Sequence, residues 1–233
     1  ARRLVGDYVY TMTDATEQHS RAVEDYVKQI FKLSQTGDKA TTKALAERMD
    51  LGQGTVSGML RQLAQRQLVE HEPYYGVRLT ERGHNLALRI IRRHRLIELF
   101  LVKTLGLRWD EVDRDAERLE HAVSDELVER IDEFLGHPEV DPHGAPIPTA
   151  EGRIESQDFA KLTDLDVGQT GRVRRVADSD PQFLHFLHEQ GIHLNDKVEV
   201  VAAGPFGSML IKAGRTQTRL PREAAELIAV SRD

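Results

Sequence analysis

The 233-residue sequence predicts a mostly α-helical protein that ends in a smaller β portion. Three observations carry this prediction. Apolar residues recur at helical spacing over most of residues 18–135. Residues 41–80 have the order helix, tight turn, helix and β-hairpin, and short strand-like runs separated by Gly, Asp and Asn follow residue 162. We therefore expect a winged helix-turn-helix domain, a helical domain and a small β-barrel, in that order.

The composition is that of a globular protein, with 39% hydrophobic and 30% charged residues. No apolar run approaches the roughly 18 residues of a membrane span, and no secretory signal pattern opens the sequence. Cys is absent, which excludes disulfides, thiolate metal sites and Cys nucleophiles. We therefore expect a cytoplasmic protein with no membrane partner.

Charge is distributed unevenly along the chain. Residues 39–95 carry 11 Lys/Arg against 5 Asp/Glu, residues 96–160 carry 6 against 17, and residues 161–233 carry 10 against 10. A basic segment followed by an acidic one indicates two tasks. The first segment is expected to meet a polyanion, and the second to meet cations or a partner.

The basic part has the pattern of a winged helix-turn-helix. A first helix is predicted over residues 18–34, where apolar residues form one stripe. Thr41 or Thr42 can cap a short helix, the turn DLGQG follows, and a second helix is predicted over residues 54–67. The run LVEHEPYYGVRLT then indicates two short strands joined at 73–76.

In a helix-turn-helix, the second helix enters the major groove of DNA, and its first residues contact base edges. Here a Gln can pair with adenine, a Thr methyl can contact a thymine methyl, and Arg side chains can reach phosphates. The alternative is that these are surface polar residues on an ordinary pair of helices. The candidate DNA-contacting residues are Thr41, Gln53, Thr55, Ser57, Arg61, Tyr75 and Arg78.

The acidic part is predicted to hold two long helices, residues 82–105 and 109–135. A linker with four prolines and three glycines follows at 136–152. The run RIIRRHRLIELFLV has more apolar surface than one small domain needs, which predicts a homodimer through these helices. After residue 162, the runs GRVRRV, DKVEVVAA, SMLIKA and TQTRL indicate short strands, and PQFLHFLHEQG indicates a helix between them.

Carboxylates crowd the stretch EVDRDAERLEHAVSDE at 111–126. On one continuous helix, four of its side chains would fall within an arc of roughly 100°, and the preceding helix offers a His and a Glu at i, i+4. Two interpretations compete: a solvated helix face, or ligands for a divalent first-row metal, which carboxylates and imidazole suit. The residues concerned are Asp113, Glu117, Glu120 and His121, with His94 and Glu98 on the preceding helix.

Six stretches occur in a characteristic order along residues 23–233, with a β-rich tail behind them. They are VEDYVKQIFKL, GTVSGMLRQL, VRLTERG, RRHRLIELFL, ERLEHAVSDE and GAPIP. In this order the chain resembles the diphtheria toxin repressor family of metal-dependent transcriptional regulators. The most specific elements are the RHRL motif, which a Glu follows, and the motif E-x-x-E-H-x-x-S.

The resemblance implies a homodimer that binds a roughly palindromic double-stranded operator only when metal is bound. Members of the family control metal homeostasis, mostly by repressing uptake genes, although activation of efflux genes also occurs. The implied parts are an N-terminal extension (1–17), a winged helix-turn-helix domain (18–83), a helical metal-binding and dimerisation domain (84–149) and an SH3-like β-barrel (150–233).

The resemblance also implies two metal sites and favours Mn²⁺. Iron-responsive members have Met and Cys where this chain has Asp25 and Glu117, whereas manganese-responsive members have carboxylates there. Hard oxygen ligands suit Mn²⁺, and Fe²⁺ is the alternative. Lys28 stands where a small manganese-responsive relative has a Glu ligand, so the geometry of that relative is not carried over. The implied ligands are Asp25, Glu117, Glu120 and His121 in a regulatory site, His94, Glu98 and Asp113 in a second site, and Asp178 from the barrel.

Two other functions are compatible with parts of the sequence. The run ERLEH is close to the H-x-x-E-H pattern of zinc proteases, but Glu117 occupies the place of the first His, so an enzyme is not expected. A winged-helix regulator that senses an organic ligand or an acid is the other alternative. The remaining His residues, His143 among them, are expected to be surface or structural residues.

Overall fold

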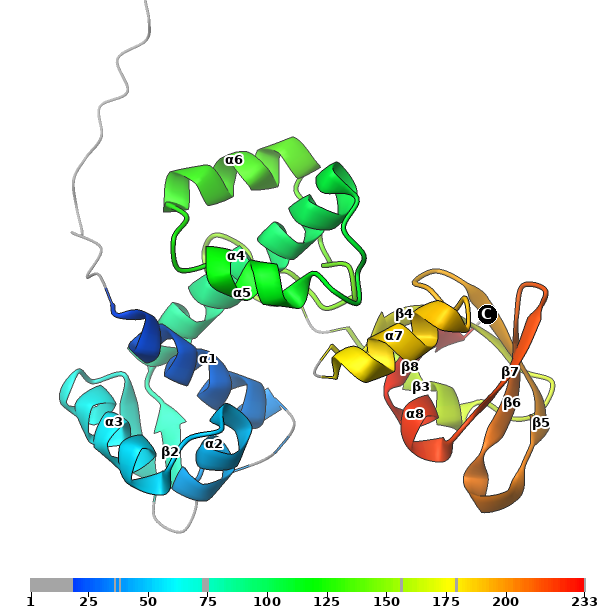
Figure 1. Ribbon diagram of the computed structural model, residues 1–233, viewed down its shortest axis with the longest axis horizontal. Helices are drawn as coiled ribbons and strands as arrows, with labels where there is room; N and C mark the ends of the chain where they lie inside the picture. The colour runs from blue at the N-terminus through cyan, green and yellow to red at the C-terminus, as the bar shows by residue number, and fades with distance from the viewer. Residues whose placement is uncertain are drawn as a thin grey trace, which may run out of the picture. The chain divides into compact units, whose positions relative to one another are not determined.

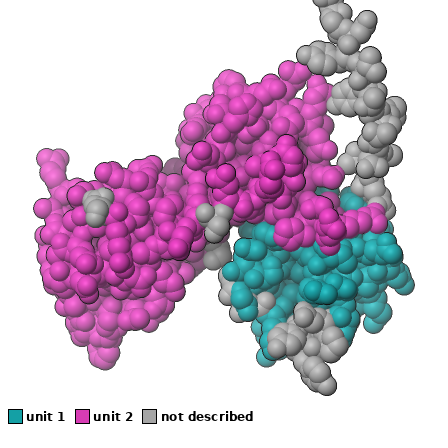
Figure 2. Space-filling model, turned by 180° about the vertical axis from the view of Figure 1, so that it is seen from behind, with its two compact units in different colours: residues 1–80 teal, residues 81–233 magenta. Residues whose placement is uncertain are grey.

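The structure is a computed structural model that describes residues 19–35, 37, 39–72, 76–155, 157–178 and 180–232. The chain divides into two compact units, residues 1–80 and residues 81–233, which Figure 2 distinguishes by colour. Among the described residues, no helix combines the length and the apolar character needed to cross a membrane.

Unit 1 has the predicted order of helix, tight turn, helix and hairpin (Figure 1). The Thr41 hydroxyl caps the second helix by accepting a hydrogen bond from the Ala44 amide at 3.1 Å. The two strands pair antiparallel with Val69 opposite Leu79. Tyr75 lies outside the described residues. The elements are α1 (Arg21–Gln35), α2 (Thr42–Met49), α3 (Gln53–Gln65), β1 (Val69–Glu72) and β2 (Gly76–Leu79).

Unit 2 opens with three helices, α4 (Glu81–Leu105), α5 (Asp113–Leu119) and α6 (Asp125–Leu135). The prediction of one helix over residues 109–135 is therefore wrong. The helix ends after Leu119, and Ser124 begins the next one in an extended conformation, with its hydroxyl accepting from the Leu127 amide at 3.2 Å. A Ser in this role is a standard N-cap, and it marks a helix start inside the acidic stretch.

Helix α4 is the centre of the helical part. Leu96 and Leu99 belong to a buried cluster with residues of α6, whereas Ile97 and Leu101 belong to a second cluster with residues of α5. This arrangement leaves His94 and Glu98, one turn apart on α4, buried beside the acidic stretch. The position of the metal-binding candidates therefore follows from how α4 packs.

The segment 136–152 is not the open linker that its Pro and Gly content predicts. Asp141 and His143 are buried within it, and so are Ala145 and Ile147. The Asp141 carboxylate accepts hydrogen bonds from the backbone amides of His143 and Ala145 at 2.8 and 3.0 Å. These bonds satisfy the backbone of a tight turn, so the segment packs against the helices instead of bridging two domains.

The C-terminal part is the expected small antiparallel β-structure with helix α7 (Pro181–Glu189) between strands (Figure 1). The sheet has the order β3-β8-β4-β5-β6-β7, so the last strand returns beside the first two. Strands β3 and β8 and the short helix α8 (Arg222–Glu226) were not predicted. The strands are β3 (Ala160–Lys161), β4 (Thr170–Val176), β5 (Lys197–Ala203), β6 (Met209–Ala213), β7 (Thr216–Leu220) and β8 (Ile228–Arg232).

The turn between α4 and α5 joins the helical part to the barrel. Trp109 belongs to the buried hydrophobic core of the barrel. The next side chain, Asp110, is 1% exposed, receives two hydrogen bonds from Arg108 and lies 3.0 Å from His185 of α7. Burial raises the pKa of Asp110, but the hydrogen bonds from Arg108 and His185 outweigh it and lower this pKa from 3.8 to about 2.

We expect Asp110→Asn to lower the free energy of unfolding by about 2 kcal/mol at pH 7, because each pKa unit corresponds to 1.36 kcal/mol. The pKa of Asp110 is lower in the folded state, so its contribution is present above about pH 4 and is lost as the pH falls towards about 2. Urea unfolding of wild type and Asp110→Asn between pH 7 and pH 3 measures the difference in their free energies of unfolding, which should narrow as the pH falls.

The matched control is Asp166→Asn, since Asp166 is exposed on the barrel and its replacement is expected to change stability by less than about 0.5 kcal/mol. Equal stability of wild type and Asp110→Asn at pH 7 would show that the Arg108–Asp110–His185 contact does not stabilise unit 2.

Candidate metal centres and DNA-reading surface

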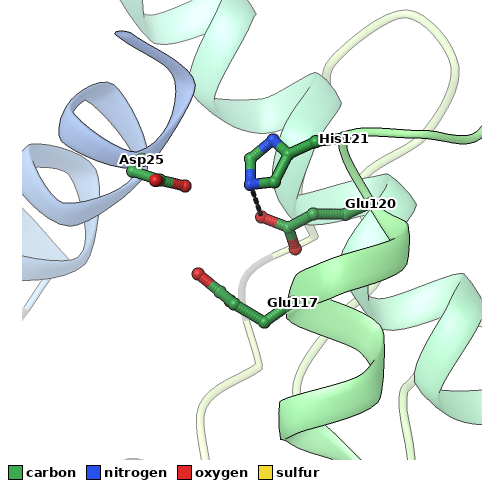
Figure 3. Close-up of side chains that lie close together, drawn as sticks. All are labelled: Asp25, Glu117, Glu120 and His121. Carbon is green, nitrogen blue, oxygen red and sulfur yellow. Dashed lines mark ion pairs between the residues drawn. The ribbon is translucent and has the colours of Figure 1, made fainter. Parts of the chain in front are cut away.

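The end of α5 brings together two carboxylates and an imidazole. Glu117, Glu120 and His121 each place one ligand atom within 4.8 Å of the others, and Figure 3 shows the three side chains turned toward the same space. Glu120 is fully buried, and its Oε1 lies 3.4 Å from Nε2 of His121. We call Glu117, Glu120 and His121 the first cluster.

Asp25, also labelled in Figure 3, belongs to α1 of unit 1. Its carboxylate makes an ion pair with Arg21 one turn earlier, at 3.8 Å. The side chain is 26% exposed, so it is not enclosed in the core of that unit.

The first cluster contains three of the four side chains expected on one helix face, Glu117, Glu120 and His121. Only Asp113 and Glu117 lie on α5, one turn apart, whereas Glu120 and His121 lie at and beyond its C-terminal end. The backbone stays helical at Glu120, whose amide donates to the Ala116 carbonyl at 2.9 Å, so Glu120 lies one turn from Glu117 on the same face. Asp113 and Glu117 form a second group with His94 of α4, again with ligand atoms within 4.8 Å.

His94 connects these groups. Its Nδ1 lies 2.6 Å from Oε2 of Glu120, and its Nε2 lies 3.4 Å from both Oε1 of Glu98 and Oδ1 of Asp113. Burial by itself lowers the pKa of His94, but the charge of Glu98 and the hydrogen bonds that the imidazole donates to Asp113, Glu120 and Glu98 raise it well above its usual value. An imidazolium at this position balances part of the surrounding negative charge.

A third group, which we call the buried pocket, consists of Glu98, Asp141 and His143. All three side chains are buried, and one ligand atom from each lies within 4.8 Å of the others. The sequence prediction included Glu98 but missed Asp141 and treated His143 as a surface or structural residue. The spacing Asp-x-His was the available signal, and the Pro and Gly content around it favoured a linker.

The donors of the buried pocket fit a cation. Among the described residues, Oε2 of Glu98, Oδ2 of Asp141 and Nδ1 of His143 are buried without a hydrogen-bond partner. Nε2 of His143 lies 2.7 Å from the Trp109 carbonyl, so this nitrogen carries a proton, and in the neutral imidazole Nδ1 presents a lone pair. A lone pair and two carboxylates facing each other repel, unless a cation or a proton lies between them.

The barrel adds charge to this pocket. Burial and the charges of Glu98 and, after β4, Asp178 raise the pKa of Asp141 to about 6, although Arg95 and His143 act in the opposite direction. Arg95 of α4 approaches Asp141, with its Nε 3.4 Å from Oδ2 of the carboxylate.

Of the predicted DNA-contacting residues that the structure describes, Thr41 caps α2, and the others lie on α3 and on the wing. Gln53 and Thr55 are exposed in the first turn of α3, and Ser57 is half-buried. Arg61 is exposed one turn further, and Arg78 on β2 makes a 2.9 Å ion pair with Glu70 on β1. An exposed polar first turn on the second helix is the arrangement that reads a major groove.

Three family descriptions match successive parts of the chain. Residues 18–77 match the N-terminal DNA-binding domain of iron-dependent repressors, and residues 80–149 match their metal-binding and dimerisation domain. Residues 160–232 match the FeoA domain. Together they follow the three structural parts described above.

Curated relatives and solved structures give the same result as these domain matches. The chain is 29% identical to the iron-dependent repressor IdeR of Mycobacterium tuberculosis over 90% of this chain and 96% of that protein. It is 30% identical to the diphtheria toxin repressor of Corynebacterium jeikeium over 68% of each chain. A manganese-dependent transcriptional repressor in complex with manganese is 42% identical, with a TM-score of 0.82, over 91% of this chain and all of that one. The manganese regulator SloR is 33% identical, with a TM-score of 0.75, over 91% and 98% of the two chains.

Proposed function

The chain belongs to the diphtheria toxin repressor family of metal-dependent DNA-binding repressors, and we propose that Mn²⁺ is the cation to which it responds. The observation that carries this proposal is the donor set of the first cluster: two carboxylates, one imidazole and no sulfur. Hard oxygen donors suit Mn²⁺, whereas thiolate and thioether donors favour softer metals. Fe²⁺ binds the same oxygens, so selectivity arises from geometry and from metal availability.

The first cluster is the proposed regulatory site, and Asp25 of α1 is its proposed fourth ligand. The family resemblance assigns Asp25 and Glu117 to positions where manganese-responsive members have carboxylates. A bound divalent cation would offset the mutual repulsion of these carboxylates. Since Asp25 belongs to unit 1 and the other ligands to unit 2, a shared cation would restrain the DNA-binding unit against the helical domain.

The second site is proposed at Glu98, with Asp141 and His143 of the buried pocket as its further ligands in place of the His94 and Asp113 that the resemblance implies. Oε2 of Glu98 and Nδ1 of His143, which have no hydrogen-bond partner among the described residues, support this role, and the charge of Asp178 acts on Asp141. Glu98 also lies 3.4 Å from His94, whose Nδ1 contacts Glu120 of the first cluster. The two proposed sites are therefore joined by the single imidazole of His94.

For DNA, we propose that the first turn of α3 reads base edges through Gln53, Thr55 and Ser57, with Arg61 on phosphates. The wing, with Arg78, is proposed to contact the backbone. The operator is proposed to be roughly palindromic, with half-sites about one helical turn apart or a multiple of it. Metal-uptake genes are the proposed targets of repression.

We expect operator affinity to rise with Mn²⁺ by a coupling of about 1–3 kcal/mol or more, which corresponds to at least a 5- to 150-fold change. His121→Ala should remove most of this increase, whereas Glu133→Gln on the exposed face of α6 should leave it intact. Fluorescence anisotropy with labelled operator, in chelator and in Mn²⁺, measures both. Equal affinity of wild type under the two conditions would refute the proposed function.

We expect the double change Asp25→Met and Glu117→Cys to shift the response from Mn²⁺ toward Fe²⁺ and Zn²⁺, because sulfur donors favour later metals. The measurement is operator binding titrated with each metal under anaerobic conditions. Wild-type protein that ignores Mn²⁺ at every concentration and responds to Fe²⁺ would overturn the hard-ligand argument.

We expect a homodimer through the helical domain. On α6, Leu127 is 47% exposed and Phe134, two turns later, is 69% exposed. This exposed apolar stripe is the surface that we expect a second copy of the chain to cover. Phe134→Glu should raise the dimer dissociation constant at least tenfold, as read by light scattering, while Phe206→Glu on the barrel should not change it. A monomeric wild type in Mn²⁺ would contradict this expectation.

A further inference from the structure

The imidazole of His143 serves two partners at once. Its Nδ1 faces the carboxylates of the buried pocket, 4.0 Å from both Glu98 and Asp141. Its Nε2 donates to the Trp109 carbonyl at 2.7 Å, and its ring stacks on the Trp109 indole with centroids 5.7 Å apart and planes at 27°. One orientation of a rigid ring satisfies both sets of contacts, so moving the ring for one partner disturbs the other.

The Trp109 indole, which stacks on His143, is part of the barrel core. It is 9% exposed within the barrel core, and it packs against His193 with centroids 5.9 Å apart. His193 in turn meets His188 of α7 edge to face, at 5.6 Å. A continuous row of rings therefore runs from the buried pocket to the surface of the barrel.

The backbone of the same turn is also fixed to the barrel. The Val176 amide of β4 donates to the His143 carbonyl at 2.9 Å. Gly144 has a φ of +84°, and a Cβ there would lie 2.0 Å from the Arg174 carbonyl oxygen, so no larger residue fits. The turn that supplies Asp141 and His143 to the buried pocket thus also contacts strand β4 of the barrel.

We propose that His143, Trp109 and His193 couple cation binding in the buried pocket to the seating of the barrel on the helical domain. The proposal rests on the proposed second site. Trp109 and His193 act as positioning residues: Trp109 holds the His143 ring, and His193 packs against Trp109. Coupling between two sites is reciprocal, so weakening the barrel side must weaken cation binding by the same factor.

The test uses the full chain carrying Asp25→Ala and His121→Ala, which removes ligands of the first cluster without touching the buried pocket. Calorimetric titration with Mn²⁺ then reports the pocket. Added His193→Ala is expected to weaken Mn²⁺ binding about three- to tenfold, and His193→Phe, which keeps an aromatic ring, is expected to restore it. The matched control is His137→Ala, an exposed His of the helical part, with an expected change below twofold.

Two further readouts separate coupling from a general loss of stability. Trp109 is the single Trp of the chain, so saturating Mn²⁺ should change the intrinsic Trp emission, and Asp141→Asn should abolish the change. Mn²⁺ should also slow hydrogen exchange at the Val176 amide at least threefold, and again Asp141→Asn should abolish the effect. Both readouts report the surroundings of His143, because Trp109 and the Val176 amide contact that residue directly.

Equal Mn²⁺ affinity of His193→Ala and His137→Ala, or an unchanged Val176 exchange rate at saturation, would overturn the proposal. Absence of saturable Mn²⁺ binding in the parent variant would also overturn it, together with the second site. Operator binding by the otherwise wild-type chain in Mn²⁺ and in chelator tests the proposed function separately, so the two failures are distinguishable.

Discussion

The burial of carboxylates beside one another is the constraint on which the rest of unit 2 depends. Glu98, Glu120 and Asp141 are at most 2% exposed, and Asp113 and Glu117 approach them from α5. Buried charge is costly unless it is paired. His94 and Arg95 offset part of it, and we infer that divalent cations offset the rest. This requirement makes the local fold sensitive to metal.

His94 links the buried carboxylates of the two clusters. Its two nitrogens face different carboxylates, Glu120 on one side and Glu98 with Asp113 on the other. From Glu98 the chain of contacts continues to His143 and to Trp109 in the barrel core. The first cluster and the barrel are therefore connected through side chains that are buried along most of the path, and a rearrangement at one end has a physical route to the other.

Much of this organisation was predictable because it is local. Periodic apolar residues and turn signals predict α1 to α4 and four of the barrel strands, and the family motifs single out the candidate ligands on α4 and α5. The helix break after Leu119 was missed because an arc of charged residues was projected onto one continuous helix, although Ser124 is an N-cap.

The buried pocket was missed for a different reason. Asp141 and His143 lie in a segment whose composition indicates a linker, and their partner Glu98 is more than 40 residues earlier in the sequence. Only the packed turn, held by the Asp141 carboxylate and by Val176 of the barrel, shows that the segment is structural. Long-range packing of this kind leaves no periodic signal in a single sequence.

The most direct test of the central claim is anomalous diffraction from crystals of the full chain grown with Mn²⁺, recorded on both sides of the manganese absorption edge. Two anomalous peaks per chain are expected, one among Glu117, Glu120 and His121 and one among Glu98, Asp141 and His143. Protein that binds its operator in Mn²⁺ yet shows no anomalous peak at either cluster would contradict the claim that these carboxylates are assembled around cations.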